Sequence, residues 1–209
     1  MNDGIAVAVA VGVTATPLWR SIGTHVVTVV HEGGHALVVG RSSGSQVGSI
    51  RVNRDGTGST KATNRVRDGG AFLMAGYLTP PAVGLGALAA AHVERGGAAL
   101  MVLLGGVVLV LVSVRNVFGL AVVFLLSAGL YLAVHHADGP TQDAVLLVFG
   151  WTLLLGSVRD TMSGLVHGLG DAQALSKTIG LPARLWVIFF ALTACAAVYC
   201  AAWLTVTYW

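Results

Sequence analysis

IGTHVVTVVHEGGHALVV, residues 22–39, is an apolar run that contains the motif HExxH at His31, Glu32 and His35. As a helix, this run is long enough to cross most of a bilayer. Residues four apart share one face of a helix, so the two imidazoles can hold one metal ion from the same side. Glu32 follows the first imidazole and can take a proton from a water beside the ion. The stretch therefore predicts a catalytic zinc site in a membrane helix.

Glu32 is one of only two glutamates in the chain, and no Lys or Arg lies near it on its helix. A carboxylate without a nearby cation is costly at membrane depth and indicates a functional site. The competing explanation is a chance match to a short pattern. The scarcity of His and Glu in this chain makes that explanation weak.

Composition assigns the whole chain to the membrane. Its 209 residues are 55% hydrophobic and 10% charged, and the mean hydropathy is +0.79. These values exclude a soluble globular protein and predict an all-α, polytopic helix bundle that forms a single domain over residues 1–209. The basic residues are scattered and lack interleaved aromatic residues, so we expect no nucleic-acid partner. The sequence leaves the oligomeric state open.

We expect about six to seven transmembrane segments. The predicted order is an N-terminal apolar segment (4–20), the HExxH helix (21–40), a hairpin loop (41–69), four spans within 70–158, a polar segment (159–182) and a last span (183–207). Pro17 interrupts the N-terminal segment, which suits a short span, a re-entrant piece or an interfacial helix. Pro80 and Pro81 should break the span in which they lie.

A small β-hairpin is predicted directly after the HExxH helix. Residues 47–53 and 57–63 flank Arg54-Asp55-Gly56, which is a turn signal. The hairpin offers an edge to which an extended substrate could add as a strand. An ordinary loop between two spans is the alternative interpretation.

Charge distribution predicts the orientation of the chain in the membrane. Ten of the twelve basic residues fall inside if the C-terminal end of the HExxH helix is cytoplasmic, and only Arg20 and Arg95 fall outside. The ten are Arg41, Arg51, Arg54, Lys61, Arg65, Arg67, Arg115, Arg159, Lys177 and Arg184. The two motif histidines would then lie about 7–14 Å below the inner face. A third ligand from the same side must come from Asp160, His167 or Asp171.

Several further stretches accompany HEGGHAL: SIRVNRDGTGST in the hairpin region, AGYLTPP in the next span, and GDAQAL followed by LPARLW late in the chain. Together they resemble the site-2 protease family of intramembrane zinc metalloproteases, in its short branch without a PDZ insertion. The resemblance implies that His31 and His35 bind zinc and that Glu32 is the general base. It also implies a late aspartate as third ligand, which matches Asp171, with Asp160 and His167 as alternatives. The LDG-type motif of the larger branch is missing here.

The resemblance further implies a zinc metalloendopeptidase that cleaves a membrane-spanning protein near the cytoplasmic side, as in regulated intramembrane proteolysis. The expected location is the prokaryotic cell membrane, with the lipid bilayer as surroundings and the active site towards the cytoplasm. The alternatives are a non-proteolytic zinc-binding scaffold, a metal transporter, and a zinc hydrolase acting on a lipid or a prenylated peptide. Most spans carry no acidic residue, which disfavours a transporter.

Overall fold

The computed structural model describes residues 3–16, 22–64, 66, 68–167 and 170–207. Within these residues the chain forms helices and one two-stranded antiparallel sheet. The elements are α1 (Asp3–Ala15), α2 (Thr24–Arg41), β1 (Val47–Val52), β2 (Gly58–Ala62), α3 (Gly69–His92), α4 (Gly96–Ser113), α5 (Val117–His136), α6 (Gly139–His167), α7 (Gly170–Ile179) and α8 (Ala183–Thr207).

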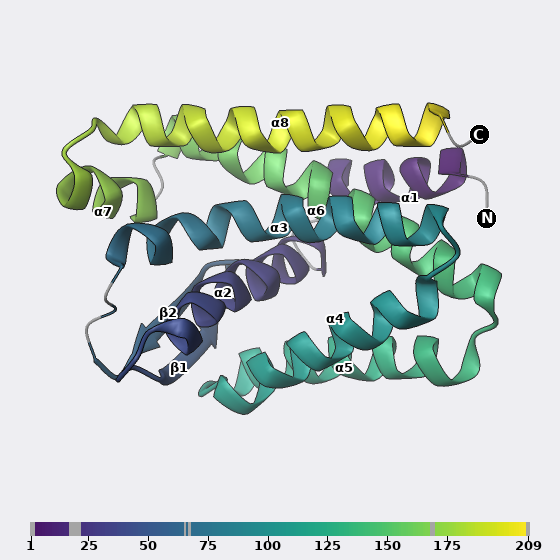
Figure 1. Ribbon diagram of the computed structural model, residues 1–209, viewed down its shortest axis with the longest axis horizontal. Helices are drawn as coiled ribbons and strands as arrows, with labels where there is room; N and C mark the ends of the chain where they lie inside the picture. Colours follow the sequence, from purple (N-terminus) through teal and green to yellow (C-terminus); the bar gives the residue numbers. More distant parts are fainter. Residues whose placement is uncertain (1–2, 17–21, 65, 67, 168–169, 208–209) are drawn as a thin grey trace.

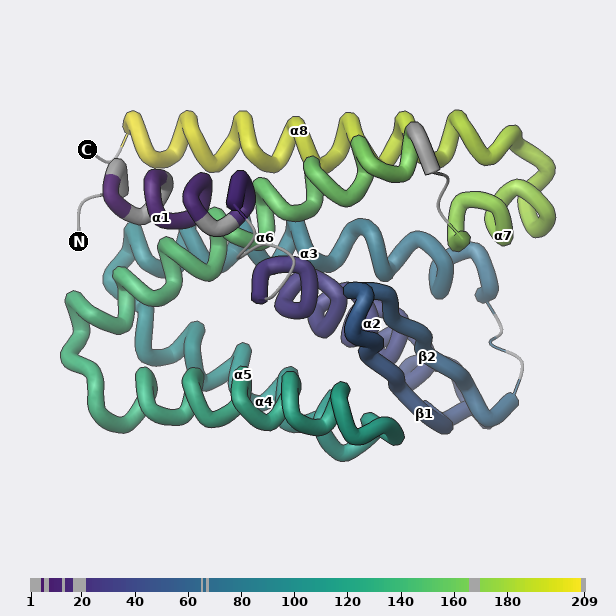
Figure 2. Tube along the Cα trace, turned by 180° about the vertical axis from the view of Figure 1, so that it is seen from behind, coloured from purple at the N-terminus to yellow at the C-terminus, as the bar shows by residue number. Residues whose placement is uncertain are grey.

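Helix α3 runs through the middle of the bundle and contacts α2, α6, α7 and α8 (Figure 1). Helices α4 and α5 pack together along one side, and α8 extends along the opposite side. The view from behind shows α1 lying along α6 beside α8 (Figure 2). The β-hairpin and α7 both lie at the end of the bundle away from the chain termini.

Five helices of the described chain, α3, α4, α5, α6 and α8, are long and apolar enough to cross a membrane. The protein is therefore an integral membrane protein with an all-α bundle, as its composition predicts. Helix α2 is not among the five, because its three histidines, its glutamate and its arginine lower its hydropathy. The predicted polar segment 159–182 contains the last turns of α6 and all of α7.

Helix α1 has 13 residues and packs against α6 within the bundle. At the C-terminal end of α1, the Thr14 carbonyl accepts a hydrogen bond of 2.6 Å from Nη1 of Arg159 on α6. A cation at a helix C-terminus satisfies carbonyl groups that have no partner within the helix. The interruption predicted at Pro17 lies outside the described residues.

The expected break at Pro80 and Pro81 is not observed, since α3 continues without interruption from Gly69 to His92. Each proline lacks the N–H that would bond to the carbonyl four residues earlier. Both rings are buried in the bundle. Packing by neighbouring helices lets a membrane helix tolerate prolines in its interior.

The predicted hairpin is confirmed. Strands β1 and β2 pair Ile50 with Thr60 and Val52 with Gly58. The turn closes through Asn53 N–H, which donates to the Thr57 carbonyl at 2.8 Å. Gly56 has a φ of +85°, a left-handed conformation that favours glycine. The side chains of Ile50 and Val52 are fully buried and hold the hairpin against the bundle.

Candidate active site

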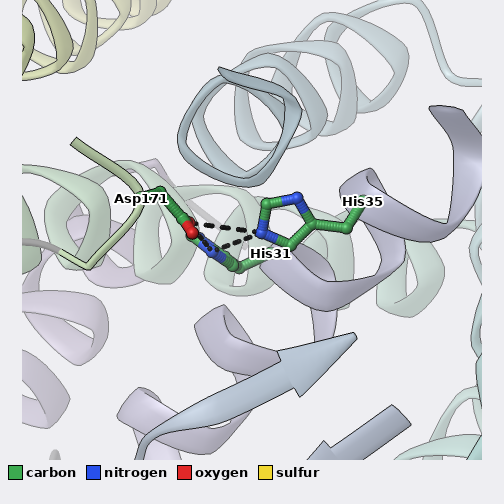
Figure 3. A group of neighbouring side chains, drawn as sticks. All are labelled: His31, His35 and Asp171. Atoms are coloured by element: carbon green, nitrogen blue, oxygen red, sulfur yellow. Dashed lines mark hydrogen bonds and ion pairs between the residues drawn. The ribbon is translucent and has the colours of Figure 1, made fainter. Parts of the chain in front are cut away.

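Three side chains from two distant parts of the sequence meet at the middle of α2. His31 and His35 lie one helical turn apart, and Asp171 lies in the first turn of α7. Asp171 Oδ2 is 3.3 Å from Nε2 of His31 and 3.3 Å from Nε2 of His35. The two Nε2 atoms are 3.1 Å apart. Figure 3 shows the carboxylate and both imidazoles pointing towards one another.

This arrangement has the dimensions of a metal site. Ligand atoms bound to one tetrahedral zinc at about 2.0–2.1 Å lie about 3.3–3.4 Å apart, close to the observed separations. Two imidazole nitrogens and one carboxylate oxygen are ordinary zinc ligands, and three protein ligands leave a fourth position open. Among the described residues, these three form the group of side chains that could hold a metal ion.

Neighbouring groups on α3 fix the orientation of both imidazoles. His35 Nδ1 lies 2.6 Å from the Phe72 carbonyl oxygen. Because a carbonyl only accepts, Nδ1 carries a proton, and Nε2 is the nitrogen that faces Asp171. The ring of His31 meets the ring of Tyr77 edge to face at a centroid distance of 4.6 Å. Gly76 lies between these contacts, where a Cβ would be 2.5 Å from His31 Nε2 and 2.6 Å from His35 Nε2.

Asp171 is placed to stay ionised. Burial raises the pKa of its carboxyl, but hydrogen bonds and positive charge from His31 and His35 outweigh that effect. The pKa is therefore held well below its usual range. The first turn of a helix also favours a negative charge. An ionised carboxylate is the form that binds a cation.

Glu32 is 3% exposed and faces strand β2. Thr60 Oγ1 donates a hydrogen bond to Glu32 Oε2 at 2.6 Å. Gly58 lies against the same carboxylate, because a Cβ at this position would overlap Glu32 Oε1. The carboxylate is thus enclosed between its own helix and the hairpin.

The turn of the hairpin is fastened to the N-terminal half of α2. Thr28 Oγ1 donates to the Gly56 carbonyl at 2.6 Å, and His25 Nε2 lies 3.2 Å from the Asn53 carbonyl oxygen. His25 also packs edge to face against the ring of Phe118. His25 therefore packs against the hairpin and α5 and does not belong to the group formed by His31, His35 and Asp171.

A cavity of about 610 Å³ extends from the cluster along the hairpin. It is lined by side chains of α2, by residues 55–60, by Phe72 and Tyr77 on α3, by Asp160, Ser163 and Gly164 on α6, and by the start of α7. The cavity brings strand β2 next to the cluster.

The edge of β1 that faces away from β2 is already occupied. Arg115 N–H donates to the Ile50 carbonyl at 3.0 Å. The side-chain amide of Asn116 bonds to both the N–H and the carbonyl of Val52. Because the backbone groups of Ile50 and Val52 point away from β2, each forms a non-hydrogen-bonded pair with its β2 partner. The N–H and C=O of those partners, Thr60 and Gly58, therefore point to the other edge of the hairpin.

The other two candidates for a third ligand have different positions. Asp160 lines the cavity but does not belong to the group that could hold an ion. His167 is the last residue of α6, and its side chain lies outside the described part of the structure. Thr60, Gly58 and Gly76 lie within the quoted stretches SIRVNRDGTGST and AGYLTPP. Nothing in the sequence singles them out as site residues, because Thr and Gly are common and no spacing connects them to the HExxH motif.

A family model described as Peptidase M50B-like matches residues 4–201 of this chain, which is nearly its whole length. No curated protein and no solved structure matches the chain.

Proposed function

Because the chain belongs to the Peptidase M50B-like family of metalloproteases, we propose that it is an intramembrane zinc metalloendopeptidase that cleaves a membrane-spanning protein. The observation that carries the proposal is the convergence of His31, His35 and Asp171 beside Glu32. Two imidazoles and a carboxylate with an open fourth position are typical of a catalytic zinc site rather than a closed structural one. In this proposal the three residues hold the ion and Glu32 is the general base.

Bound zinc would supply Lewis-acid chemistry, lowering the pKa of a water and polarising the scissile carbonyl. The carboxylate of Glu32 then accepts a proton from the attacking water and donates it to the leaving nitrogen. The near-complete burial of Glu32 strengthens its interactions with the reacting groups. The predicted orientation gives cleavage near the cytoplasmic side of the cell membrane.

The hairpin supports an extended substrate conformation. In a helix, the amides of the scissile segment are bonded internally, so the substrate must unwind before hydrolysis. Strand β2 lines the cavity, and the backbone groups of Gly58 and Thr60 point to its open edge. An unwound segment can pair with these groups as an added strand. The edge of β1 cannot serve, because residues 115 and 116 already occupy it.

A substrate trap tests the proposed activity. The Glu32→Gln variant should keep its zinc, lose cleavage and retain an uncleaved membrane protein that mass spectrometry can identify after purification. Metal analysis of the wild-type protein should give one zinc per chain. A non-proteolytic zinc-binding scaffold does not use Glu32 as a base, so its function would survive this substitution. Unimpaired cleavage by Glu32→Gln would therefore refute the protease proposal.

Strand addition has its own test. Thr60→Pro removes the backbone N–H at the open edge, whereas Thr60→Val keeps it. Proline is tolerated on an edge strand when its missing N–H faces outwards. We expect the proline variant to raise KM for the trapped substrate well above the value of the valine variant, with zinc retained in both. Equal KM values would exclude pairing at this position.

A further inference from the structure

We propose that Thr60 is a positioning residue that joins the general base to the substrate-binding edge of the hairpin. The inference rests on the proposed function, since it assigns Glu32 as the base. Its first support is the 2.6 Å hydrogen bond from Thr60 Oγ1 to Glu32 Oε2. A hydroxyl that donates to a buried carboxylate makes a charge-assisted hydrogen bond, which is stronger than a bond between neutral groups. The bond fixes the direction in which the carboxylate points.

The second support is the packing of Gly58, two residues earlier on the same strand. A Cβ at this position would overlap Glu32 Oε1 and would lie 2.8 Å from Glu32 Cγ. Residues two apart on a strand point to the same face. Strand β2 therefore contacts one carboxylate oxygen through the Thr60 hydroxyl and the other carboxylate oxygen through the backbone at Gly58.

The third support is that, among the described residues, the Thr60 hydroxyl is the group that donates a hydrogen bond to the Glu32 carboxylate. The described residues that line the cavity include no Lys or Arg. Glu32 is 3% exposed and borders the cavity. In the structure, the Thr60 hydroxyl donates the side-chain hydrogen bond that orients the carboxylate.

These contacts give Thr60 two tasks at once. Its side chain holds the base, while its backbone N–H and C=O point to the open edge where a substrate strand would pair. Thr60 therefore fixes the distance between a paired substrate strand and the carboxylate of Glu32. Loss of the hydroxyl should consequently slow the chemical step, and substrate pairing through the backbone should remain.

The test compares Thr60→Val, which keeps the shape and the backbone N–H, with Thr60→Ser, which keeps the hydroxyl. Thr193→Val is the matched control, because the Thr193 hydroxyl bonds within α8 and does not line the cavity. The probe is a fluorogenic peptide carrying the segment cleaved in the trapped membrane protein, assayed in detergent micelles. Zinc content and thermal unfolding are measured for every variant, and Glu32→Gln is assayed in parallel.

We expect Thr60→Val to lower kcat about 10- to 100-fold, the effect of losing one hydrogen bond to a charged group. KM and zinc content should stay close to wild type. Thr60→Ser should recover most of kcat, and Thr193→Val should match wild type. Gly58→Ala should also lower kcat with zinc retained, because the added methyl group displaces the carboxylate.

A wild-type kcat in Thr60→Val would overturn the inference. So would a rise in KM alone, loss of zinc, or a serine variant as slow as the valine variant. If Glu32→Gln also cleaved the peptide, the proposed function would fail and not only the role of Thr60. Loss of activity in Glu32→Gln together with full activity in Thr60→Val would discard only the positioning role.

Discussion

Gly76→Ala should remove metal binding while leaving the helix that carries it intact. The new Cβ would lie 2.5 Å from His31 Nε2 and 2.6 Å from His35 Nε2. Ordinary van der Waals contact begins at 3.4 Å, so the methyl group comes about 0.9 Å too close to His31 Nε2 and about 0.8 Å too close to His35 Nε2. Metal–ligand distances tolerate changes of about 0.2 Å. The imidazoles must therefore turn out of position, and we expect zinc affinity to fall at least about 100-fold, beyond the usual effect of altering an outer-shell group.

The assay for this variant is zinc stoichiometry and competition with a chromogenic chelator, together with circular dichroism and thermal unfolding. Gly86→Ala is the matched control, because it lies on the same helix and a Cβ there meets nothing within 4 Å. Alanine favours the helix over glycine by about 1 kcal/mol at both positions, so helix propensity cannot account for a loss of zinc. If Gly76→Ala bound zinc as tightly as Gly86→Ala, the assigned geometry of the cluster would be refuted.

Three other predictions concern the same region. Asp171→Ala should weaken zinc binding at least about 100-fold, while Asp160→Ala keeps most of the metal; metal analysis of both purified variants compares them. Zinc should dissociate as the pH falls from about 7 to about 5, because an imidazole must be neutral to bind it. The lowered pKa of Asp171 keeps its carboxylate ionised over that range, so retention after gel filtration should follow imidazole protonation. Asn116→Ala removes two hydrogen bonds to the backbone of Val52, and thermal unfolding should show a loss of about 1–3 kcal/mol; an unchanged unfolding temperature would contradict the anchoring of β1.

The fold class and the position of the hairpin could be predicted because the signals for both are local. An apolar run of span length forms a helix in lipid, where backbone groups must bond internally. Arg54-Asp55-Gly56 indicates a tight turn through the glycine that can adopt a positive φ. The prediction of a break at Pro80 and Pro81 was wrong. Whether proline breaks a helix also depends on the neighbouring helices, which the local sequence does not specify.

The sequence by itself determined a membrane bundle, a metal motif on one helix and a short set of candidates for a third ligand. The tertiary structure alone decided that Asp171 lies with the two histidines, although 140 positions separate it from His31. It also decided that Thr60 contacts Glu32 and that the open edge of the hairpin belongs to β2. The physical reason is that helix formation follows from local transfer free energy, whereas helix packing in lipid depends on close contacts and polar bonds that hydrophobicity does not encode.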